Sequence, residues 1–300
     1  GRRDCELLSM RFDHVVWRPG THILAYSTVP VFMGPGYAPS HDMRTIDMDT
    51  LTKDTIFDFG EGGIFTFSPD GAQVALSTPE SISLANADGS NLRANVLTYP
   101  IVSTYSEYQY HPSPIWASDS MSLRVGIPPE DPLAETPQPT TLWQLPVNGS
   151  APTQLGSIQT LSLAWPDKIF SPDMSLIAYP QRIGEPTDNQ SELHVAYADG
   201  SNDYVVASGG IIEFYGWSPD GTRFVYADDA IYLGSISGDV FTVASLRQTM
   251  HKVQWVDASR LIFIYDYAGT LELRISDQDG ERHALIDTLT DQLANFDFTK

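Results

Sequence analysis

The residues of this sequence that could bind a metal ion are carboxylates in short polar segments. Asp277-Gln278-Asp279-Gly280 resembles part of a calcium-binding loop, but it lacks the acidic ligand that should follow, and its Asp-Gly pair also suits a hairpin turn. Asp228-Asp229 offers carboxylate oxygens, the ligands that calcium prefers. We therefore expect no cofactor, and calcium at Asp228-Asp229 is the alternative.

Sequence motifs of nucleophilic and metal-dependent catalysis are absent. The sequence contains no G-x-S-x-G, no H-E-x-x-H and no C-x-x-C. Cys5 is the single cysteine, so an internal disulfide is impossible. No residue is predicted to be catalytic, and we expect a protein that is not an enzyme.

Four segments, residues 29–42, 98–114, 128–139 and 181–191, are too long for hairpin turns. Two of them, residues 29–42 and 98–114, carry tyrosine, whose ring and hydroxyl suit the recognition of peptides or sugars. Long loops are commonly functional. The candidate binding residues are Phe32, Tyr37, His41, Tyr105, Tyr108, Tyr110, His111, Arg182 and Glu185. The alternative is that the tyrosines form a small core within their loop and that the histidines face solvent.

The elements that must position these loops follow from a sixfold repeat. Each copy is a short strand that ends in an aromatic residue, a tight polar turn and a second apolar strand. The aromatic residues are Trp17, Phe67, Trp116, Phe170, Trp217 and Trp255, which lie 38 to 54 positions apart. Four short strands with their turns need roughly 40 residues, the size of one propeller blade.

The turn of this repeat has its most regular form, Ser-Pro-Asp-Gly, at residues 68–71 and 218–221. Proline presets φ, aspartate can bond nearby backbone, and glycine tolerates a left-handed conformation. We therefore interpret Asp70, Asp173 and Asp220 as structural. A second strand, with alternating apolar residues and often followed by Asp-Gly or Asn-Gly, accompanies each copy, as expected for a half-buried strand before a hairpin turn.

Together the two motifs predict an all-β fold, a six-bladed β-propeller of four-stranded antiparallel blades in one domain over residues 1–300. The predicted blades are 12–60, 61–100, 105–156, 165–208, 211–247 and 251–287. Phe298 lies in phase with the aromatic anchors, so residues 288–300 are expected to form a ring-closing strand. A seventh blade completed by both termini is the alternative. With this strand order, the four long segments should converge on one face.

The repeats at residues 67–71 (Phe-Ser-Pro-Asp-Gly) and 217–221 (Trp-Ser-Pro-Asp-Gly) resemble those of the TolB-like six-bladed propeller family, which are WD-like repeats. The copy at residues 170–174 lacks the glycine, and the other three match only in pattern. The resemblance covers about residues 12–286. It implies a propeller of the kind found in a periplasmic translocation protein, in prolyl oligopeptidase-like enzymes and in secreted proteins, and hence an extracellular or periplasmic location, with the signal peptide absent from this sequence.

Acidic residues outnumber basic residues, 38 to 17, for a formal net charge of −21. Such a surface repels phosphate backbones and anionic lipid, and no apolar run is long enough for membrane insertion. We expect a monomeric, secreted or periplasmic binding module that presents one loop-rich face to a protein or peptide partner. Two alternatives stay open: a hydrolase or lyase acting on a carbohydrate or lactone at the central channel, and the extracellular sensor part of a longer protein.

Overall fold

The computed structural model describes residues 10–30, 41–105, 109–136, 138–160, 169–184, 188–245, 252–267, 270–277 and 282–289. These residues form 23 strands, and no helix occurs among them. The chain divides into two compact units, residues 1–155 and residues 156–298.

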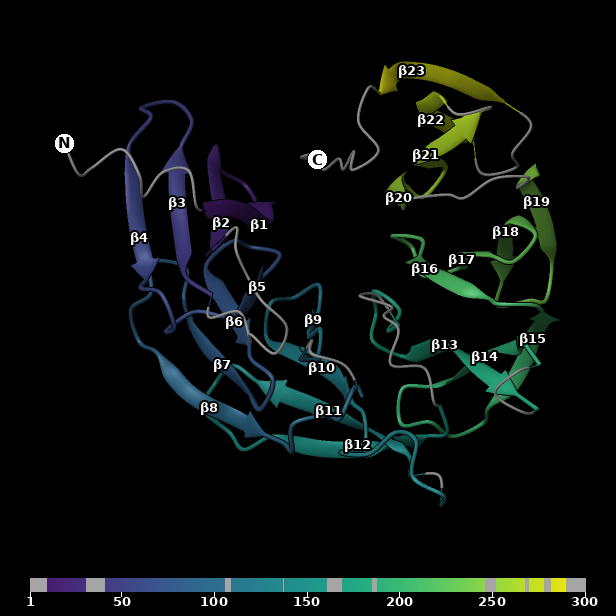
Figure 1. Ribbon diagram of the computed structural model, residues 1–300, viewed down its shortest axis with the longest axis horizontal. Helices are drawn as coiled ribbons and strands as arrows, with labels where there is room; N and C mark the ends of the chain where they lie inside the picture. Colours follow the sequence, from purple (N-terminus) through teal and green to yellow (C-terminus); the bar gives the residue numbers. More distant parts are fainter. Residues whose placement is uncertain are drawn as a thin grey trace. The chain divides into compact units, whose positions relative to one another are not determined.

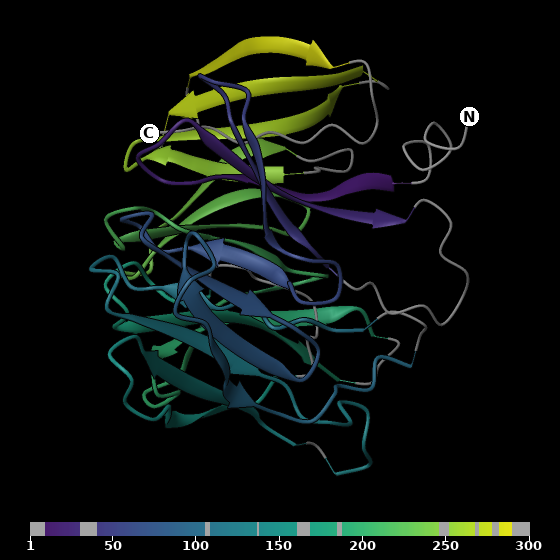
Figure 2. The same cartoon turned by 90° about the vertical axis from the view of Figure 1, so that its left-hand side faces the viewer.

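The first unit contains three four-stranded antiparallel sheets, the first three blades (Figures 1 and 2). Their strands are β1 (Met10–Trp17), β2 (Ile23–Pro30), β3 (Met43–Asp47), β4 (Lys53–Phe57), β5 (Ile64–Phe67), β6 (Gln73–Ser77), β7 (Ser81–Asn86), β8 (Arg93–Thr98), β9 (Ile115–Trp116), β10 (Ser122–Ile127), β11 (Thr140–Pro146) and β12 (Thr153–Ile158). Neighbours in each sheet are consecutive in the chain, so each blade is a simple meander. The division between the units falls within β12.

The second unit contains the remaining three blades (Figure 1). Their strands are β13 (Leu176–Ile183), β14 (Gln190–Tyr197), β15 (Tyr204–Gly209), β16 (Glu213–Trp217), β17 (Arg223–Ala227), β18 (Ala230–Ser235), β19 (Val240–Ser245), β20 (Lys252–Asp257), β21 (Arg260–Tyr267), β22 (Thr270–Asp277) and β23 (His283–Leu289). The fifth and sixth blades have four strands each. In the fourth, Phe170 forms an isolated antiparallel bridge to Ile177 beside the three named strands.

Six consecutive antiparallel meanders make the chain a six-bladed β-propeller, which confirms the predicted fold class. No seventh sheet occurs among the described residues. The ring-closing strand expected at residues 288–300 lies outside the described residues except for its first two positions, which belong to β23. That strand and the single-domain organisation stay predictions.

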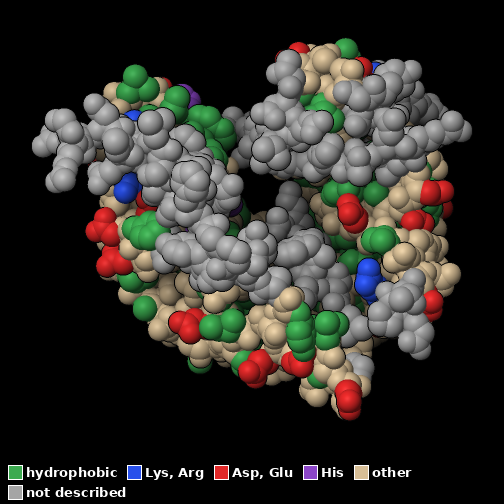
Figure 3. All heavy atoms as spheres, in the orientation of Figure 1, with side chains coloured by type: hydrophobic (Ala, Val, Ile, Leu, Met, Phe, Trp, Pro, Cys, Tyr) green, Lys and Arg blue, Asp and Glu red, His purple; other side chains and the backbone are tan. Residues whose placement is uncertain are grey.

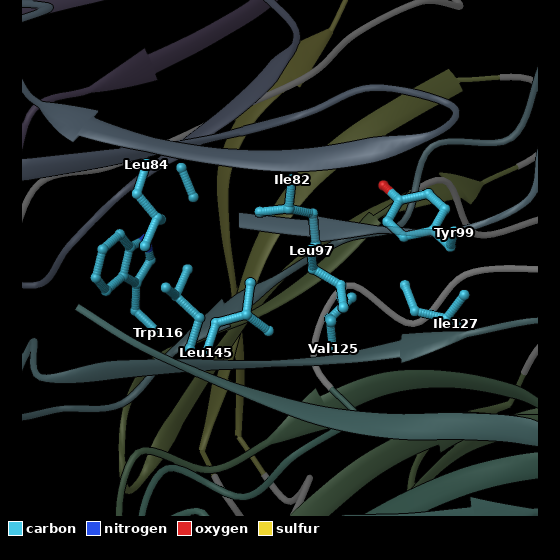
Figure 4. Close-up of a cluster of buried hydrophobic side chains, with 10 residues drawn as sticks. Ile82, Leu84, Leu97, Tyr99, Trp116, Val125, Ile127 and Leu145 are labelled. Atoms are coloured by element: carbon cyan, nitrogen blue, oxygen red, sulfur yellow. The ribbon is translucent and has the colours of Figure 1, made fainter. Parts of the chain in front are cut away.

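The hydrophobic core of each unit lies between successive blades. Figure 4 shows the cluster between the second and third blades, in which Ile82 and Leu97 of the second blade meet Val125 and Leu145 of the third. These side chains are buried because alternate residues of a strand point to the same face of the sheet, and both faces of an inner strand are covered by neighbouring blades. The apolar residues that alternate along each strand in the sequence are therefore the ones that pack between neighbouring blades.

Tryptophans of the repeat add a directional contact to this packing. The indole Nε1 of Trp116 donates to the carbonyl oxygen of Thr66 at 3.2 Å, and the Nε1 of Trp217 donates to that of Ile169 at 2.8 Å. The Nε1 of Trp255 donates to the carbonyl oxygen of Gly216 at 3.3 Å. In each case the acceptor belongs to the preceding blade, so the anchor residue fixes the position of one blade against another.

The Ser-Pro-Asp-Gly turns are closed by their own side chains. Ser68 Oγ donates to Asp70 Oδ1 at 2.5 Å and accepts the amide of Gln73 at 2.9 Å. The hydroxyl of Ser68 and the amide of Ala72 lower the pKa of Asp70. Gly71 has a φ of 68°, the left-handed value that this turn requires.

The same geometry persists where the repeat has lost its glycine. Met174 stands at the corresponding position of the fourth copy with a φ of 62°, and Ser120 stands in the third copy with a φ of 61°. Ser171 Oγ still donates to Asp173 Oδ1 at 2.6 Å in the fourth copy. The aspartates of these turns accept hydrogen bonds within their own turns, as expected for structural residues.

Candidate functional site

Two of the long segments meet in the first unit. The amide of Ser103, in the link between the second and third blades, donates to the carbonyl oxygen of Glu130 at 2.8 Å. The hydroxyl of Tyr105 donates to Asp131 Oδ1 at 2.5 Å, and this bond raises the pKa of the Tyr105 phenol. The backbone of Tyr105 is left-handed, with a φ of 54°, and 63% of the residue is exposed. The described parts of the segments 98–114 and 128–139 therefore form one surface on which Tyr105 is held in an exposed position.

His41, near the end of the long segment 29–42, contacts the segment 98–114. The rings of His41 and His111 pack edge to face, with their centroids 5.5 Å apart. The carbonyl oxygen of His41 accepts the amides of Gly60 and Gly62, at 3.1 and 3.0 Å. A Cβ atom on Gly62 would lie 2.8 Å from that oxygen, so a side chain there would displace the connection between the first two blades. His41 is buried, which corrects the alternative that it faces solvent.

A fully buried carboxylate anchors the residue next to His41. Asp42 Oδ1 accepts the amide of Thr28 at 2.7 Å, and Asp42 Oδ2 accepts the hydroxyl of Thr28 at 2.9 Å. Arg44 Nε donates to Asp42 Oδ2 at 2.5 Å, and this bond raises the pKa of the Arg44 guanidinium. Burial of an unpaired carboxylate would be costly, so this set of partners holds the end of the segment against the first blade.

A pocket of about 380 Å³ lies beside this junction. Its walls come from the connection between β4 and β5, the turn between β6 and β7, the start of β8 and the link to the third blade. The lining residues are Gly60, Glu61, Gly62, Leu76, Thr78, Pro79, Glu80, Ser81, Ser83, Leu92, Ala94, Asn95, Ile101 and Gln109. Of the lining residues, Ile101 and Gln109 belong to one of the four long segments, and the volume falls in the range of small-ligand sites.

Some of the predicted site residues lie together in the structure, and others do not. His41, Tyr105, Tyr110 and His111 belong to the segments that meet in the first unit. Arg182 is exposed on β13 in the second unit, where its register partner is Ser191. Phe32, Tyr37, Tyr108 and Glu185 lie outside the described residues. The meeting of the segments at residues 98–114 and 128–139 is thus observed, whereas the part of residues 181–191 in that face stays a prediction.

The fourth blade contains a polar cluster that sequence reasoning missed. His194 of β14 is buried, and its Nδ1 lies 3.0 Å from both carboxylate oxygens of Asp203. Its Nε2 lies 3.4 Å from Glu192 Oε2, and its ring stacks on Tyr179 with centroids 5.3 Å apart. Burial and the charge of Asp203 raise the pKa of the Tyr179 phenol. Tyr179 and His194 are register partners on adjacent strands, which explains their contact.

The carboxylates considered for calcium have protein partners. Asp228 accepts the amide of Gly210 at 3.0 Å, and Asp229 Oδ1 accepts the hydroxyl of Tyr232 at 2.6 Å. That second bond raises the pKa of Tyr232 to about 12. Within the described ranges, no group of three His, Cys, Asp or Glu residues is arranged to hold a metal ion. The expectation that the protein needs no cofactor stays a prediction.

Sequence reasoning also missed the pocket residues Glu61, Glu80, Asn95 and Gln109. A signal for the first was available, because Gly60, Gly62 and Gly63 around Glu61 indicate a close approach of two backbones. The others come together only through strand pairing and the path of the link, which no local pattern encodes.

Acidic side chains dominate the charged surface. Figure 3 shows Asp and Glu side chains scattered over the described part of one face, with few Lys or Arg side chains between them. The part of the chain that the structure describes includes no helix long and apolar enough to cross a membrane.

Comparison with known proteins reveals likeness at the level of structure. No protein-family model matches the sequence, and no curated protein matches it either. An oligogalacturonate lyase solved in complex with manganese superposes with a TM-score of 0.64 at 13% identity, over 96% of this chain and 87% of that one. The β-propeller domain of the trilobed protease from Pyrococcus furiosus gives a TM-score of 0.62 at 13% identity, over 93% and 85%.

A TolB protein from Agrobacterium tumefaciens is also among the similar structures, with a TM-score of 0.49 at 14% identity, over 84% of this chain and 90% of that one. At these identities the similarity extends to the fold alone, and propellers of this kind carry different activities. The resemblance of the repeat motif to the TolB-like family stays a prediction. The chain is a six-bladed β-propeller.

Proposed function

We propose that this chain is a non-catalytic binding module whose loop surface in the first three blades binds a protein or peptide partner. That surface is formed by residues 41–42, 60–62, 98–105, 109–114 and 128–136. Its location outside the cell or in the periplasm is part of the proposal and rests on the resemblance of the repeats. A monomer is expected.

The observation that supports the proposal is the way Tyr105 is held. A non-glycine residue with positive φ is uncommon because the conformation is sterically unfavourable. Here a tyrosine adopts it at an exposed position, and its hydroxyl is fixed by Asp131 at 2.5 Å. Burial of the ring cannot compensate for the strain, because most of the residue remains exposed. Tyrosines held rigid at the surface are typical of binding sites, since little side-chain entropy is lost on contact.

Contacts between the segments of this surface support the same function. The amide-to-carbonyl bond between Ser103 and Glu130 ties two loops together, and the paired rings of His41 and His111 join a third segment. Loops that are already ordered bind with a smaller entropic cost than loops that must fold on contact. The arrangement therefore suits recognition by a surface that changes little on binding.

The test is a selection of random displayed peptides on the purified chain, followed by binding measurements on two variants. Tyr105→Ala removes the exposed ring, and Asp131→Asn weakens the bond that orients it. We expect the selected peptides to lose at least tenfold in affinity with Tyr105→Ala and less with Asp131→Asn. Tyr204→Ala, which removes an exposed tyrosine from the outer strand β15, is the matched control and should leave affinity unchanged. Peptides that bind all three variants equally would overturn the proposal.

A further inference from the structure

The pocket beside the loop surface has an unusual balance of charge. Two of its lining residues, Glu61 and Glu80, are acidic, and none is Lys or Arg. Arg93 lies between lining residues Leu92 and Ala94 in the sequence, yet its guanidinium donates to the carbonyl oxygen of Val147 in the third blade at 2.8 Å. The pocket therefore carries carboxylates without a basic side chain of its own lining to neutralise them.

The frame of the pocket is held by hydrogen bonds that do not use these carboxylates. The hydroxyl of Tyr99 donates to the carbonyl oxygen of Thr78 at 2.9 Å, and the amide of Tyr99 donates to that of Glu80 at 3.0 Å. The amide of Ser81 donates to Thr78 Oγ1 at 3.1 Å, which closes the turn on which Glu80 stands. The connection that carries Glu61 is fixed by the bonds of the Gly60 and Gly62 amides to the carbonyl oxygen of His41. Both carboxylates are thus carried by backbone that is already ordered.

The remaining lining is suited to an aliphatic chain. Leu76, Pro79, Leu92 and Ile101 supply apolar area, and Leu92 and Ile101 are about half exposed, so this area is open to solvent. Lys and Arg side chains bury their methylene stems on apolar surface while the charged end makes polar contacts. Charge-assisted hydrogen bonds to carboxylates are the stronger class of hydrogen bond. A neutral or anionic side chain would leave the two carboxylates without such partners.

We infer that this pocket receives a lysine or arginine side chain of the bound protein or peptide, and that Glu61 and Glu80 accept its charged group. The inference rests on the proposed function, because it assigns the pocket to the same partner as the loop surface. The net charge of −21 favours the same ligand class, since it attracts basic partners over long range at low salt.

The test uses two synthetic pentapeptides, Gly-Ser-Lys-Ser-Gly and its norleucine counterpart, both with blocked ends. Norleucine keeps the aliphatic stem and lacks the charge. Binding is followed by chemical-shift changes of the backbone amides of Gly60, Gly62, Ser81 and Asn95 in the isotopically labelled full chain. We expect the lysine peptide to bind at least tenfold more tightly than the norleucine peptide in 50 mM salt, and this preference to fall several-fold in 500 mM salt.

Three variants locate the effect. Glu61→Gln and Glu80→Gln each remove one charge while keeping the shape of the side chain, and each should reduce the preference for lysine about threefold. The double variant should bring the preference close to one. Asp54→Asn, which removes one charge from an exposed position on β4, should leave it unchanged. An equal response to both peptides, or a preference that persists in the double variant, would overturn the inference.

The outcome can be separated from that of the peptide selection. If the selected peptides depend on Tyr105 but show no preference for lysine at the pocket, this inference fails and the proposed function stands. If the pocket prefers lysine while no selected peptide depends on Tyr105, the pocket is a cation site and the proposed function fails.

Discussion

Replacement of Trp217 by phenylalanine should reveal how much the bond between blades contributes to stability. The indole Nε1 donates to the carbonyl oxygen of Ile169 at 2.8 Å, and the residue is only 5% exposed. Its ring packs against Phe214 and Phe224, with centroid distances of 6.2 and 5.4 Å. Phenylalanine keeps an aromatic ring at this position but removes the hydrogen-bond donor and part of the ring volume.

The expected magnitude follows from these two losses. A hydrogen bond of this kind contributes about 0.5–1.5 kcal/mol. The missing ring atoms leave a gap in a packed core. Truncation of a whole tryptophan side chain costs about 3–5 kcal/mol, so this smaller loss should cost roughly 1–2 kcal/mol. Together the variant should lose about 1.5–3.5 kcal/mol of its free energy of unfolding, which reduces the ratio of folded to unfolded protein by roughly 10- to 400-fold.

The assay is urea unfolding followed by far-ultraviolet circular dichroism, combined with native-state hydrogen exchange of the β16 and β17 amides. Trp143→Phe is the control, because its Nε1 donates to Thr141 Oγ1 at 2.9 Å within its own strand and the residue is only half-buried. We expect this variant to lose less than about 1 kcal/mol, since a threonine hydroxyl near solvent can bond to water instead. A loss at Trp217 no larger than that at Trp143 would refute the reasoning that the bond between blades is a major contributor.

The remaining predictions concern the turns and one close backbone contact. Ser68→Ala removes a buried hydroxyl that bonds Asp70 and Gln73, so the free energy of unfolding should fall by about 1–2 kcal/mol in urea melts; an unchanged midpoint would show that the hydroxyl is dispensable. The pKa of Asp70 is lowered in the folded state, so its stabilising contribution is present above the unfolded pKa of about 3.9 and is lost as the pH falls through the lower folded value. The destabilisation by Ser68→Ala should therefore shrink between pH 5 and pH 2, and a constant difference across that range would contradict the linkage. Gly63→Ala places a Cβ atom 2.6 Å from the carbonyl oxygen of Ser77, so we expect a loss of about 1–3 kcal/mol by thermal unfolding; a melting temperature equal to that of the unchanged chain would contradict the close contact.

Much of the fold was predictable because its signals are local. The bonds of Ser68 to Asp70 and Gln73 span two and five residues, and the left-handed position belongs to the same turn. Such a motif needs no partner elsewhere in the chain, so it can be recognised wherever it recurs. Met174 shows the limit of prediction from such motifs. It adopts the left-handed backbone conformation typical of glycine, although the residue type gives no signal for it.

The candidate site was predictable in part because topology sends certain connections to the same end of each blade. Segments 98–114 and 128–139 were expected to meet for that reason, and the bonds of Ser103 and Tyr105 show that they do. The pocket was not predictable, because its walls come from four parts of the chain, and its volume depends on how side chains fill the space between strands.

The sequence by itself determined the strands and turns of six repeats, since period-two alternation and turn chemistry act over a few residues and repeat along the chain. It left six or seven blades open, and the six sheets were decided by the structure. The tertiary structure decided which polar residues come together. His194 meets Asp203 and Tyr179 through strand register, and Glu61 and Glu80 line one pocket although the residues between them form two strands. The physical reason is that a repeated strand pattern specifies which residues of each strand are buried, whereas contacts between loops depend on distances across a whole blade.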